Sequence, residues 1–414
     1  DRADRTLPCL VSRARQGSFN MTHATDAPAT RPWRLYGTAS SLYTAKARSY
    51  LIKQGVPFES CAAGESHFRN EIVPRISRWI IPVVEHDDGA IVQDGSDIIA
   101  HFESKGPTRY PAYPNTPLHA LIGQIFEFFG GEGLLRPAMH YRWNFDAVNR
   151  DFLSVDFPLG LAPTGAPPEL KAGIFEMASA RMRSAMASFG VSQETIPTVE
   201  VAYAEFLRLF EAHLEGSPYL LGGRPTIGDY GLIAPLHAHL GRDPYPATIM
   251  KRTAYRVWRW TERMNATAQD AGEYGRPPEE LFPADAVPAT LKALLRFIAE
   301  DYLPEVRAYV AFTNAWLAER PDLAPGTNGL DRPQERRIGE VEFVWRGHSV
   351  RVGVVPYRLY LLQKVQDVAE RASPADRADM HALLTETGLS DLLTLQTSRR
   401  VERVNNLEVW GDLK

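Results

Sequence analysis

Four prolines between residues 107 and 117 separate two parts of the chain whose apolar residues are spaced differently. Proline cannot continue a helix interior, so this stretch predicts a linker. Residues 33–106 contain short apolar and β-branched runs that are typical of strands, interrupted by helical segments. Residues 118–271 repeat their apolar side chains at the 3.6-residue period of amphipathic helices. The chain therefore predicts a small mixed α/β domain followed by an all-helical domain.

The first domain has a recognisable order of predicted elements. Asp88-Gly89 is a strong hairpin turn, and Gly55 is a typical residue to end a helix. The order of strand, helix, strand, hairpin and helix is that of a thioredoxin-like fold. In chain order, we expect a strand at 33–37, a helix at 44–54, a strand at 58–61, a hairpin over 80–93 and a helix from 95 to about 104.

The rest of the chain predicts helices and one further hairpin. A Pro- and Gly-rich stretch at 271–288 marks a second boundary, and residues 272–414 form a C-terminal α/β extension. Residues 1–32 have no periodic pattern and predict a flexible tail, and Met21 raises the hypothesis that residues 1–20 are not native. Helices are expected at 118–129, 171–189, 199–214, 229–240, 252–265, 303–317 and 357–371, and a hairpin at 341–355 turning at Arg346-Gly347-His348.

Composition excludes several classes of function. Lys and Arg number 46 against 50 Asp and Glu, a net charge of −4 without long runs of either sign, which disfavours nucleic acid or a membrane as partner. Two cysteines, Cys9 and Cys61, cannot build a disulfide framework or a thiolate zinc site. His237 and His239 fall on different faces of a helix, so no metal site is expected. The expected compartment is the cytoplasm.

A hydroxyl-rich turn at 38–44 precedes the first predicted helix. The backbone N–H groups at a helix start are unpaired and favour negative charge. A thiol bound there, with the Ser41 hydroxyl donating to its sulfur, would have its pKa lowered toward the thiolate. The alternative interpretation is that Ser40 and Ser41 only cap the helix.

Two further features could hold a peptide-like ligand. Ile81-Pro82 stands at the entry to a strand, where a cis bond would leave the N–H and C=O of Ile81 free; an ordinary trans proline is the alternative. Asp94, Gly95 and Ser96 open the helix after the hairpin, and the amides there suit a carboxylate. An ordinary helix start with acidic residues in its first turn is the alternative here.

Taken together, these residues resemble the glutathione transferase family over residues 33–265. The sequence Ser-Leu-Tyr-Thr-Ala-Lys-Ala-Arg at 41–48 looks like the first-helix motif of the family. Thr226 and Asp229, three apart, look like its buried capping box, which is a folding element. The resemblance implies that Ser41 activates the thiol of glutathione and that Pro82 is the cis-proline.

The resemblance also assigns the glutathione-binding residues. It implies that Ile81 and Pro82 hold the peptide backbone, and that Asp94 is the acidic residue followed four positions later by aliphatic Ile98. Gly95 departs from the family pattern, because a hydroxyl residue usually stands there. Ser96, one position on, is the candidate to replace the lost contact to the γ-glutamyl carboxylate, and both outcomes stay open.

In such proteins the helical domain binds the second substrate. Residues 136–145 mix aromatic rings with arginine, a composition suited to a flat apolar compound with a negative group, although an aromatic cluster at helical spacing also fits a core. The expected substrate pocket is lined by Tyr43, His140, Tyr141, Arg142 and Trp143.

The implied function is a homodimeric transferase, lyase or isomerase that uses glutathione as co-substrate against a small electrophilic, aromatic compound. Conjugation, dehalogenation, ether cleavage and isomerisation all remain open. The alternative is a non-catalytic binding or scaffold protein that kept the fold. Ordinary family members have no counterpart of residues 272–414, which either cover the active-site cleft or form an oligomer surface.

Overall fold

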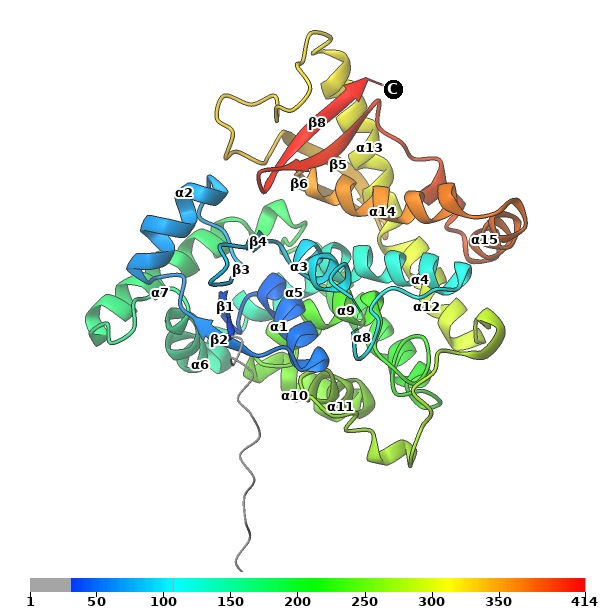
Figure 1. Ribbon diagram of the computed structural model, residues 1–414, viewed down its shortest axis with the longest axis horizontal. Coiled ribbons are helices and arrows are strands. Elements are labelled where there is room, and N and C mark those ends of the chain that lie inside the picture. The colour runs from blue at the N-terminus through cyan, green and yellow to red at the C-terminus, as the bar shows by residue number, and fades with distance from the viewer. Residues whose placement is uncertain (1–30, 107, 414) are drawn as a thin grey trace, which may run out of the picture. The chain divides into compact units, whose positions relative to one another are not determined.

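The computed structural model describes residues 31–106 and 108–413, and all of its helices and strands belong to one compact unit that begins at Pro32 (Figure 1). Most of the tail predicted at 1–32 lies outside the described residues. The domain boundaries expected inside the unit remain predictions. No helix in the described ranges is both long and apolar enough to cross a membrane.

The first part of the unit is a four-stranded mixed sheet in the order β2-β1-β3-β4. Strand β1 pairs in parallel with β2 and antiparallel with β3, which pairs antiparallel with β4. The elements are β1 (Trp33–Tyr36), α1 (Leu42–Gln54), β2 (Phe58–Cys61), the π-helical turn η1 (Phe68–Ile72), α2 (Val73–Ile76), β3 (Val83–Glu85), β4 (Ile91–Gln93) and α3 (Gly95–Glu103).

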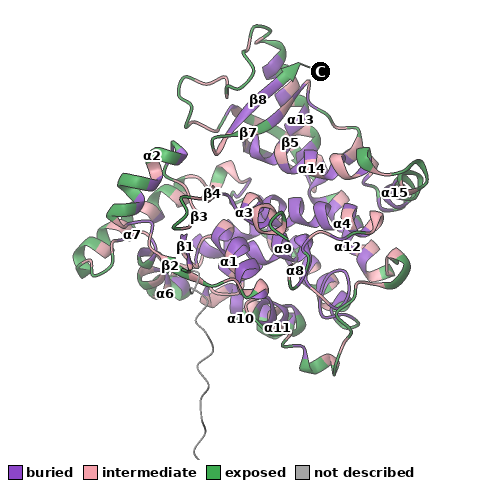
Figure 2. Cartoon of the chain, in the orientation of Figure 1, coloured by how far each residue is buried: buried purple, intermediate pink, exposed green. Residues whose placement is uncertain are grey.

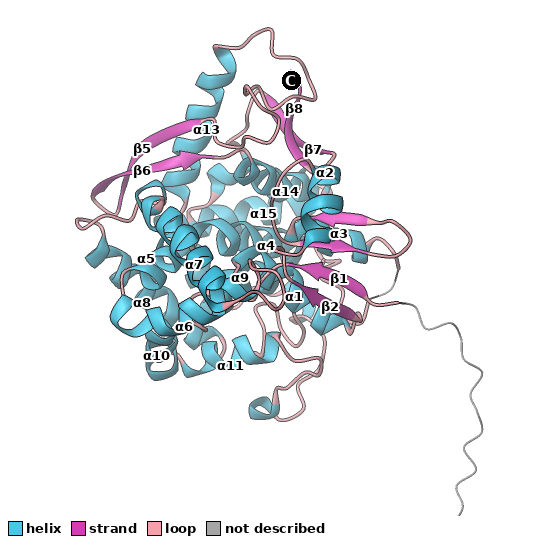
Figure 3. Ribbon diagram, turned by 90° about the vertical axis from the view of Figure 1, so that its left-hand side faces the viewer, coloured by secondary structure: helices cyan, strands magenta, loops and turns pink. Residues whose placement is uncertain are grey.

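The expected thioredoxin-like order is confirmed, and its local causes are visible. Gly55 ends α1 at φ 67°, in the left-handed region that glycine tolerates. One apolar face of α1, formed by Ala47, Tyr50 and Leu51, is completely buried. Figure 3 shows the strands of this sheet at one side of the molecule, beside a body that is mostly helical.

The second part, residues 117–264, contains helices and no strand among its described residues. Its centre is α9, which packs against α1 and α4 and is buried over almost its whole length. One helix predicted at 252–265 is two, because Ala254 leaves the helical conformation. The elements are α4 (Pro117–Phe128), the π-helical turn η2 (Phe129–Gly133), α5 (Leu135–Trp143), α6 (Asp146–Leu159), α7 (Pro168–Ser184), the short turn η3 (Met186–Ser188), α8 (Ile196–His213), α9 (Ile227–Ala238), α10 (Pro244–Thr253) and α11 (Tyr255–Met264).

The C-terminal extension contains helices and two separate hairpins. The hairpin predicted at 341–355 is confirmed with its turn at Arg346 and Gly347, and the helix predicted at 357–371 has those bounds. The second hairpin, turning at Asn405 and Asn406, was not predicted. The elements are the short turns η4 (Gly272–Tyr274) and η5 (Pro283–Asp285), α12 (Ala289–Asp301), α13 (Leu303–Ala318), β5 (Gly339–Trp345), β6 (His348–Val354), α14 (Tyr357–Arg371), α15 (Pro374–Thr387), the short turn η6 (Ser390–Leu393), β7 (Arg399–Val404) and β8 (Leu407–Leu413).

The extension packs onto the other two parts instead of standing apart. Helices α14 and α15 lie against α4, and α14 also supports β7. The buried side chains run without a break from α1 and α9 through α4 into α14 (Figure 2). The extension is therefore part of the same hydrophobic core, and its position relative to the sheet is determined by that packing.

Candidate functional site

Ser41 caps the first helix. Its backbone is extended (φ −90°, ψ 126°), and its Oγ accepts a hydrogen bond from Thr44 N at 3.4 Å. The cap uses only a lone pair of the oxygen, and within the described part of the chain no acceptor takes its hydroxyl hydrogen. Ser40, by contrast, is buried and bonded to Thr38 through their hydroxyls at 2.9 Å. The half-buried Ser41 can therefore cap α1 and still donate to a bound group.

The peptide bond between Ile81 and Pro82 is cis, as expected. Tyr36, the last residue of β1, is paired with Val83, so the loop leading to Ser41 and the cis bond lie at the same end of the sheet. The carbonyl of Pro82 accepts from Asp94 N at 3.1 Å, whereas the N–H and C=O of Ile81 have no backbone partner among the described residues. A peptide-like ligand would find one free donor and one free acceptor there.

The start of α3 is closed by its own side chains. Asp94, at φ 90°, accepts from the backbone N–H of Ser96 at 2.9 Å and of Asp97 at 3.3 Å. The Ser96 hydroxyl is completely buried, accepts from Lys46 Nζ at 2.7 Å and donates to Glu127. Intramolecular partners therefore occupy the side chains of Asp94 and Ser96 and the N–H groups of Ser96 and Asp97, and among the described residues only the Gly95 N–H is left as a donor of the predicted carboxylate subsite.

Gly95 is packed just as tightly. A Cβ at this position would lie 3.0 Å from Lys46 Cδ and 3.2 Å from the carbonyl oxygen of Tyr43. The residue that departs from the family pattern thus has no room for a larger side chain without movement of its neighbours. Beneath it, burial works to raise the pKa of Glu127, but the adjacent Lys46 outweighs burial and lowers it, so the Glu127 carboxylate is ionised.

The predicted substrate pocket is not formed by the expected side chains. Arg142 is buried in a bidentate pair with Asp243, at 2.7 and 2.9 Å, and donates to the carbonyl of Ser40 at 2.7 Å. His140, Tyr141 and Trp143 are also buried. These residues pack into the helical core and support the loop before Ser41, and this corrects the substrate-pocket assignment.

Tyr43, the remaining pocket residue, is covered by the extension. Its hydroxyl donates to Glu132 at 3.1 Å, and its ring meets that of Tyr357 edge-on, with centroids 6.4 Å apart. Arg358 holds the other oxygen of Glu132 at 3.0 Å. Burial raises the pKa of Tyr43, which keeps its phenol neutral.

The second hairpin of the extension lies over the start of α3 (Figure 1). Arg403 of β7 donates to Asp97 at 3.1 Å and to the Gln93 side chain at 2.8 Å, and Tyr360 of α14 donates to Asp97 at 2.8 Å. Sequence reasoning missed these contacts, and no local signal marks them, because Tyr360 and Asp97 are 263 positions apart. Of the two roles considered for the extension, covering this end of the sheet is the one that the geometry displays.

The capping box at the start of α9 is confirmed. Asp229 accepts from Thr226 N at 2.9 Å, and its other oxygen accepts from Leu220 N at 3.0 Å and from the Trp260 ring at 3.1 Å. Burial raises the pKa of Asp229, although these donors oppose the change. The box fixes the central helix and has no route to a ligand, as expected for a folding element.

Other binding features near Ser41 are limited. A cavity of about 200 Å³ lies beside its loop, lined by residues that include Thr38, Ala39, Cys61 and Gly160. Burial raises the pKa of the Cys61 thiol, which makes it a poor nucleophile. Within the described ranges, no group of three His, Cys, Asp or Glu side chains is placed to hold a metal ion.

Comparison with solved structures returns glutathione transferases. One from Xanthobacter autotrophicus Py2 is 20% identical, covering 56% of this chain and 93% of its own, with a TM-score of 0.32. One from Phanerochaete chrysosporium is 15% identical, covering 58% and 98%, with a TM-score of 0.41. One from Methylobacterium radiotolerans, in complex with glutathione sulfonate, is 20% identical, covering 62% and 100%, with a TM-score of 0.34.

The family matches are more direct. No curated protein matches the sequence. Residues 35–110 match the glutathione S-transferase N-terminal domain, and residues 193–263 match the glutathione S-transferase C-terminal domain. The first match spans the sheet with Ser41 and Pro82, and the second spans the capping box of α9. The chain therefore carries both domains of the glutathione transferase family, in this order, on a thioredoxin-like plus helical fold.

Proposed function

We propose that this protein binds glutathione with its sulfur against the start of α1 and uses the thiolate on a small electrophilic, aromatic compound. The observation that carries the proposal is the Ser41 hydroxyl, which caps α1 with a lone pair and keeps its hydrogen for a ligand. The free N–H and C=O of Ile81, beside the cis-proline, support it at the same end of the sheet.

The residues fit one end of glutathione better than the other. The sulfur end meets a helix N-terminus, a hydroxyl donor and an unpaired stretch of backbone. The γ-glutamyl end would meet α3, where Asp94 and Ser96 are already bonded within the protein. We therefore assign the thiol site to Ser41 and Ile81, and leave Asp94, Gly95 and Ser96 a structural role in closing α3.

The chemistry of the site follows from charge stabilisation. When bound, glutathione supplies the nucleophilic sulfur. The Ser41 hydroxyl donates a hydrogen bond to the developing thiolate, and the unpaired N–H groups of the first turn of α1 favour its negative charge. This is electrostatic stabilisation and not covalent catalysis by the protein. A disulfide exchange through a protein thiol is disfavoured, because Cys61 stands at the end of β2 with its pKa raised by burial.

A second function, a binding or scaffold protein without turnover, is favoured by a specific observation. Arg403 and Tyr360 already engage Asp97 at the start of α3, so that end of the sheet is occupied by the protein itself. In this case the protein would show no turnover of an electrophile. Homodimerisation and a cytoplasmic location remain predictions under both functions.

The substitution Ser41→Ala separates the two functions. It should lower turnover of a generic electrophile by about 10²- to 10³-fold, the usual effect of losing one donor to a developing anion. Because Ser41 caps α1, the same variant should lower the free energy of unfolding by only about 1 kcal/mol. Ser373→Ala is a matched control, because Ser373 caps α15 by the same contact, to Asp376 N at 3.2 Å, far along the chain.

The control should lose similar stability and no activity. Equal turnover in the Ser41→Ala and Ser373→Ala variants would refute the thiolate-stabilising role of Ser41. Retention on immobilised glutathione without turnover of any electrophile would favour the binding protein.

A further inference from the structure

Three arginines converge on one carboxylate where the extension meets the sheet. Glu408 of β8 accepts from Arg78 at 2.7 and 3.0 Å, from Arg336 at 3.1 Å and from Arg403 at 2.5 Å. We call Arg78, Arg336 and Arg403 the guanidinium cluster. Burial alone would raise the pKa of Glu408, but the cluster lowers it to about 2. One carboxylate therefore faces three guanidinium groups, and the excess positive charge can bind a second carboxylate.

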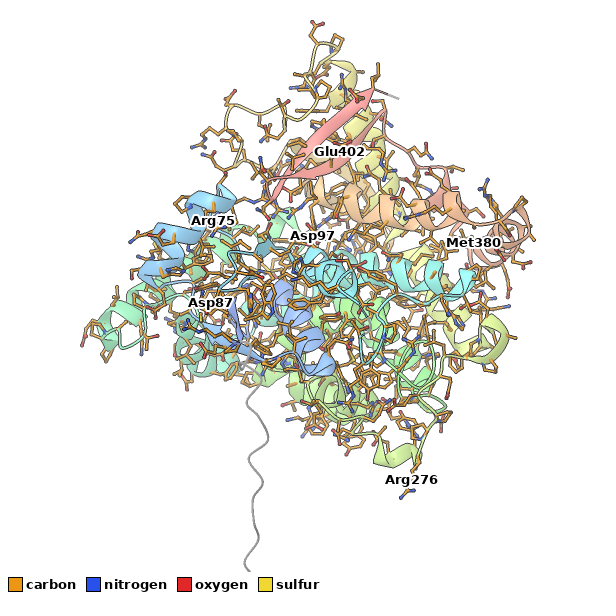
Figure 4. The ribbon with its side chains drawn as sticks, in the orientation of Figure 1. Arg75, Asp87, Asp97, Arg276, Met380 and Glu402 are labelled. Atoms are coloured by element: carbon orange, nitrogen blue, oxygen red, sulfur yellow. The ribbon has the colours of Figure 1, made fainter. Side chains whose placement is uncertain are left out.

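The cluster is linked to the proposed glutathione site through neighbouring residues. Arg78 lies three positions before Ile81, and Arg403 reaches Gln93 at the end of β4. Arg336 lies over the ring of Tyr357, 5.5 Å from its centroid, and that ring covers Tyr43 in the first turn of α1. In Figure 4, Asp97 lies below the hairpin that carries Glu402, and this is the side on which Arg403 meets Asp97.

Two donors of the cluster are unused. Arg78 Nε and Arg336 Nε are both shielded from solvent and have no hydrogen-bond partner, and the Arg78 side chain is only 6% exposed. Unpaired buried N–H groups are uncommon, and an acceptor on a ligand would satisfy these two. The Arg336 side chain as a whole is 31% exposed, although its Nε is shielded, so Arg336 is the most exposed member of the cluster.

The surrounding charges also favour an anion. The carboxylates near the cluster are Asp94, Asp97, Glu132 and Glu408, and the cations are its three arginines, Lys364, which acts on Asp97, and Arg358, which pairs with Glu132. Burial and the neighbouring Asp94 raise the pKa of Asp97, which weakens its competition for Arg403. The cations therefore outnumber the carboxylates by one, beside the positive end of α3.

We propose that the guanidinium cluster, with Arg336 as its most exposed member, binds the α-carboxylate at the γ-glutamyl end of glutathione. The inference rests on the proposed function. In this arrangement Arg336 and Arg403 take over the role that the start of α3 was expected to have. Both arginines lie outside the two matched family domains. The ligand carboxylate accepts hydrogen bonds from the open donors of the cluster. The positive charge of the three arginines then neutralises both this carboxylate and Glu408. The extension then determines which thiols the protein accepts.

The test compares the affinities of three ligands for the wild-type protein and for the Arg336→Gln variant. Binding of glutathione, γ-glutamylcysteine and cysteinylglycine to the full chain is measured by calorimetry and by tryptophan fluorescence, to which Trp79, 48% exposed beside Ile81, contributes. Arg336→Gln should lower the affinity for glutathione and for γ-glutamylcysteine by about 10- to 100-fold, the range for a lost charged hydrogen bond. Cysteinylglycine lacks the γ-glutamyl carboxylate, so its affinity should not change.

Matched variants separate this role from a structural one. Arg371→Gln removes a largely exposed arginine of the same extension and should leave all three affinities unchanged. Arg336→Lys should restore part of the affinity because the charge remains. Glu408→Gln should strengthen glutathione binding, since a competing carboxylate is lost. A cluster that only holds the extension in place would not strengthen binding in that variant.

Two failures are distinguishable. If the wild-type protein binds glutathione and Arg336→Gln binds it equally well, the cluster inference is overturned and the proposed function stands. If the wild-type protein binds none of the three ligands, the proposed function fails and the inference fails with it. Equal weakening of all three ligands by Arg336→Gln would also overturn the inference, because the effect would not depend on the γ-glutamyl end.

Discussion

The ion pairs of Glu408 join the extension to the residues before the cis-proline, and the pKa of Glu408 reflects their strength. The carboxylate is buried and its pKa falls from 4.5 to about 2. At about 1.4 kcal/mol for each tenfold change in an acid constant, this corresponds to about 3 kcal/mol of stability at neutral pH. Because the folded pKa is below the unfolded one, the contribution is complete above about pH 4.5 and is lost as the pH falls toward 2.

Glu408→Gln should therefore lower the free energy of unfolding by about 3 kcal/mol at pH 7, within the usual range for breaking a buried pair. Urea unfolding followed by tryptophan fluorescence at pH 7 and at pH 3 measures the difference. The gap between wild type and variant should narrow at the lower pH. Glu402→Gln is the control, since Glu402 is an exposed carboxylate on the neighbouring strand β7 (Figure 4). A Glu408 effect no larger than the Glu402 effect, or one independent of pH, would refute the reasoning.

Two further stability predictions concern the helical part. Arg142→Met should cost about 3–5 kcal/mol, because it leaves the fully buried Asp243 without its bidentate partner; thermal unfolding of R142M, D243N and the double variant measures the coupling, and additive effects would contradict it. Burial lowers the pKa of His213 from 6.5 to about 4, so the stability it confers is complete above pH 6.5 and declines by up to about 3 kcal/mol as the pH falls toward 4. His213→Gln should flatten that part of the pH–stability curve, and an unchanged slope between pH 6.5 and 4.5 would contradict the assignment.

Local signals were sufficient for much of the architecture. The left-handed turn at Gly55, the Asp88-Gly89 hairpin and the capping box at Thr226 each act within four residues, and each forms as predicted. The period of helix α14 gave its bounds from Tyr357 to Arg371. The hairpin at Asn405-Asn406 has no clear local signal, because four of the six residues of β7 are charged and that strand lacks the apolar alternation that marks a half-buried strand.

The site was predicted less completely than the fold. Ser41 and Pro82 were identified because a helix start and a strand entry have readable sequence contexts. The aromatic and basic run at 140–143 was expected to face a ligand, but composition does not say which side of a helix the core will cover. Asp243, about a hundred positions away, draws Arg142 inward, and no motif links the two.

The amino-acid sequence by itself determined the helices, the first sheet and the serine at the start of α1, because periodicity, caps and turns depend on neighbours along the chain. Only the tertiary structure decided that the extension closes α3 and brings three arginines onto Glu408. Arg78 and Glu408 are 330 positions apart, and contacts of that range arise when whole elements pack to bury apolar surface. The energies that select such packing are summed over the entire core and leave no local pattern to read.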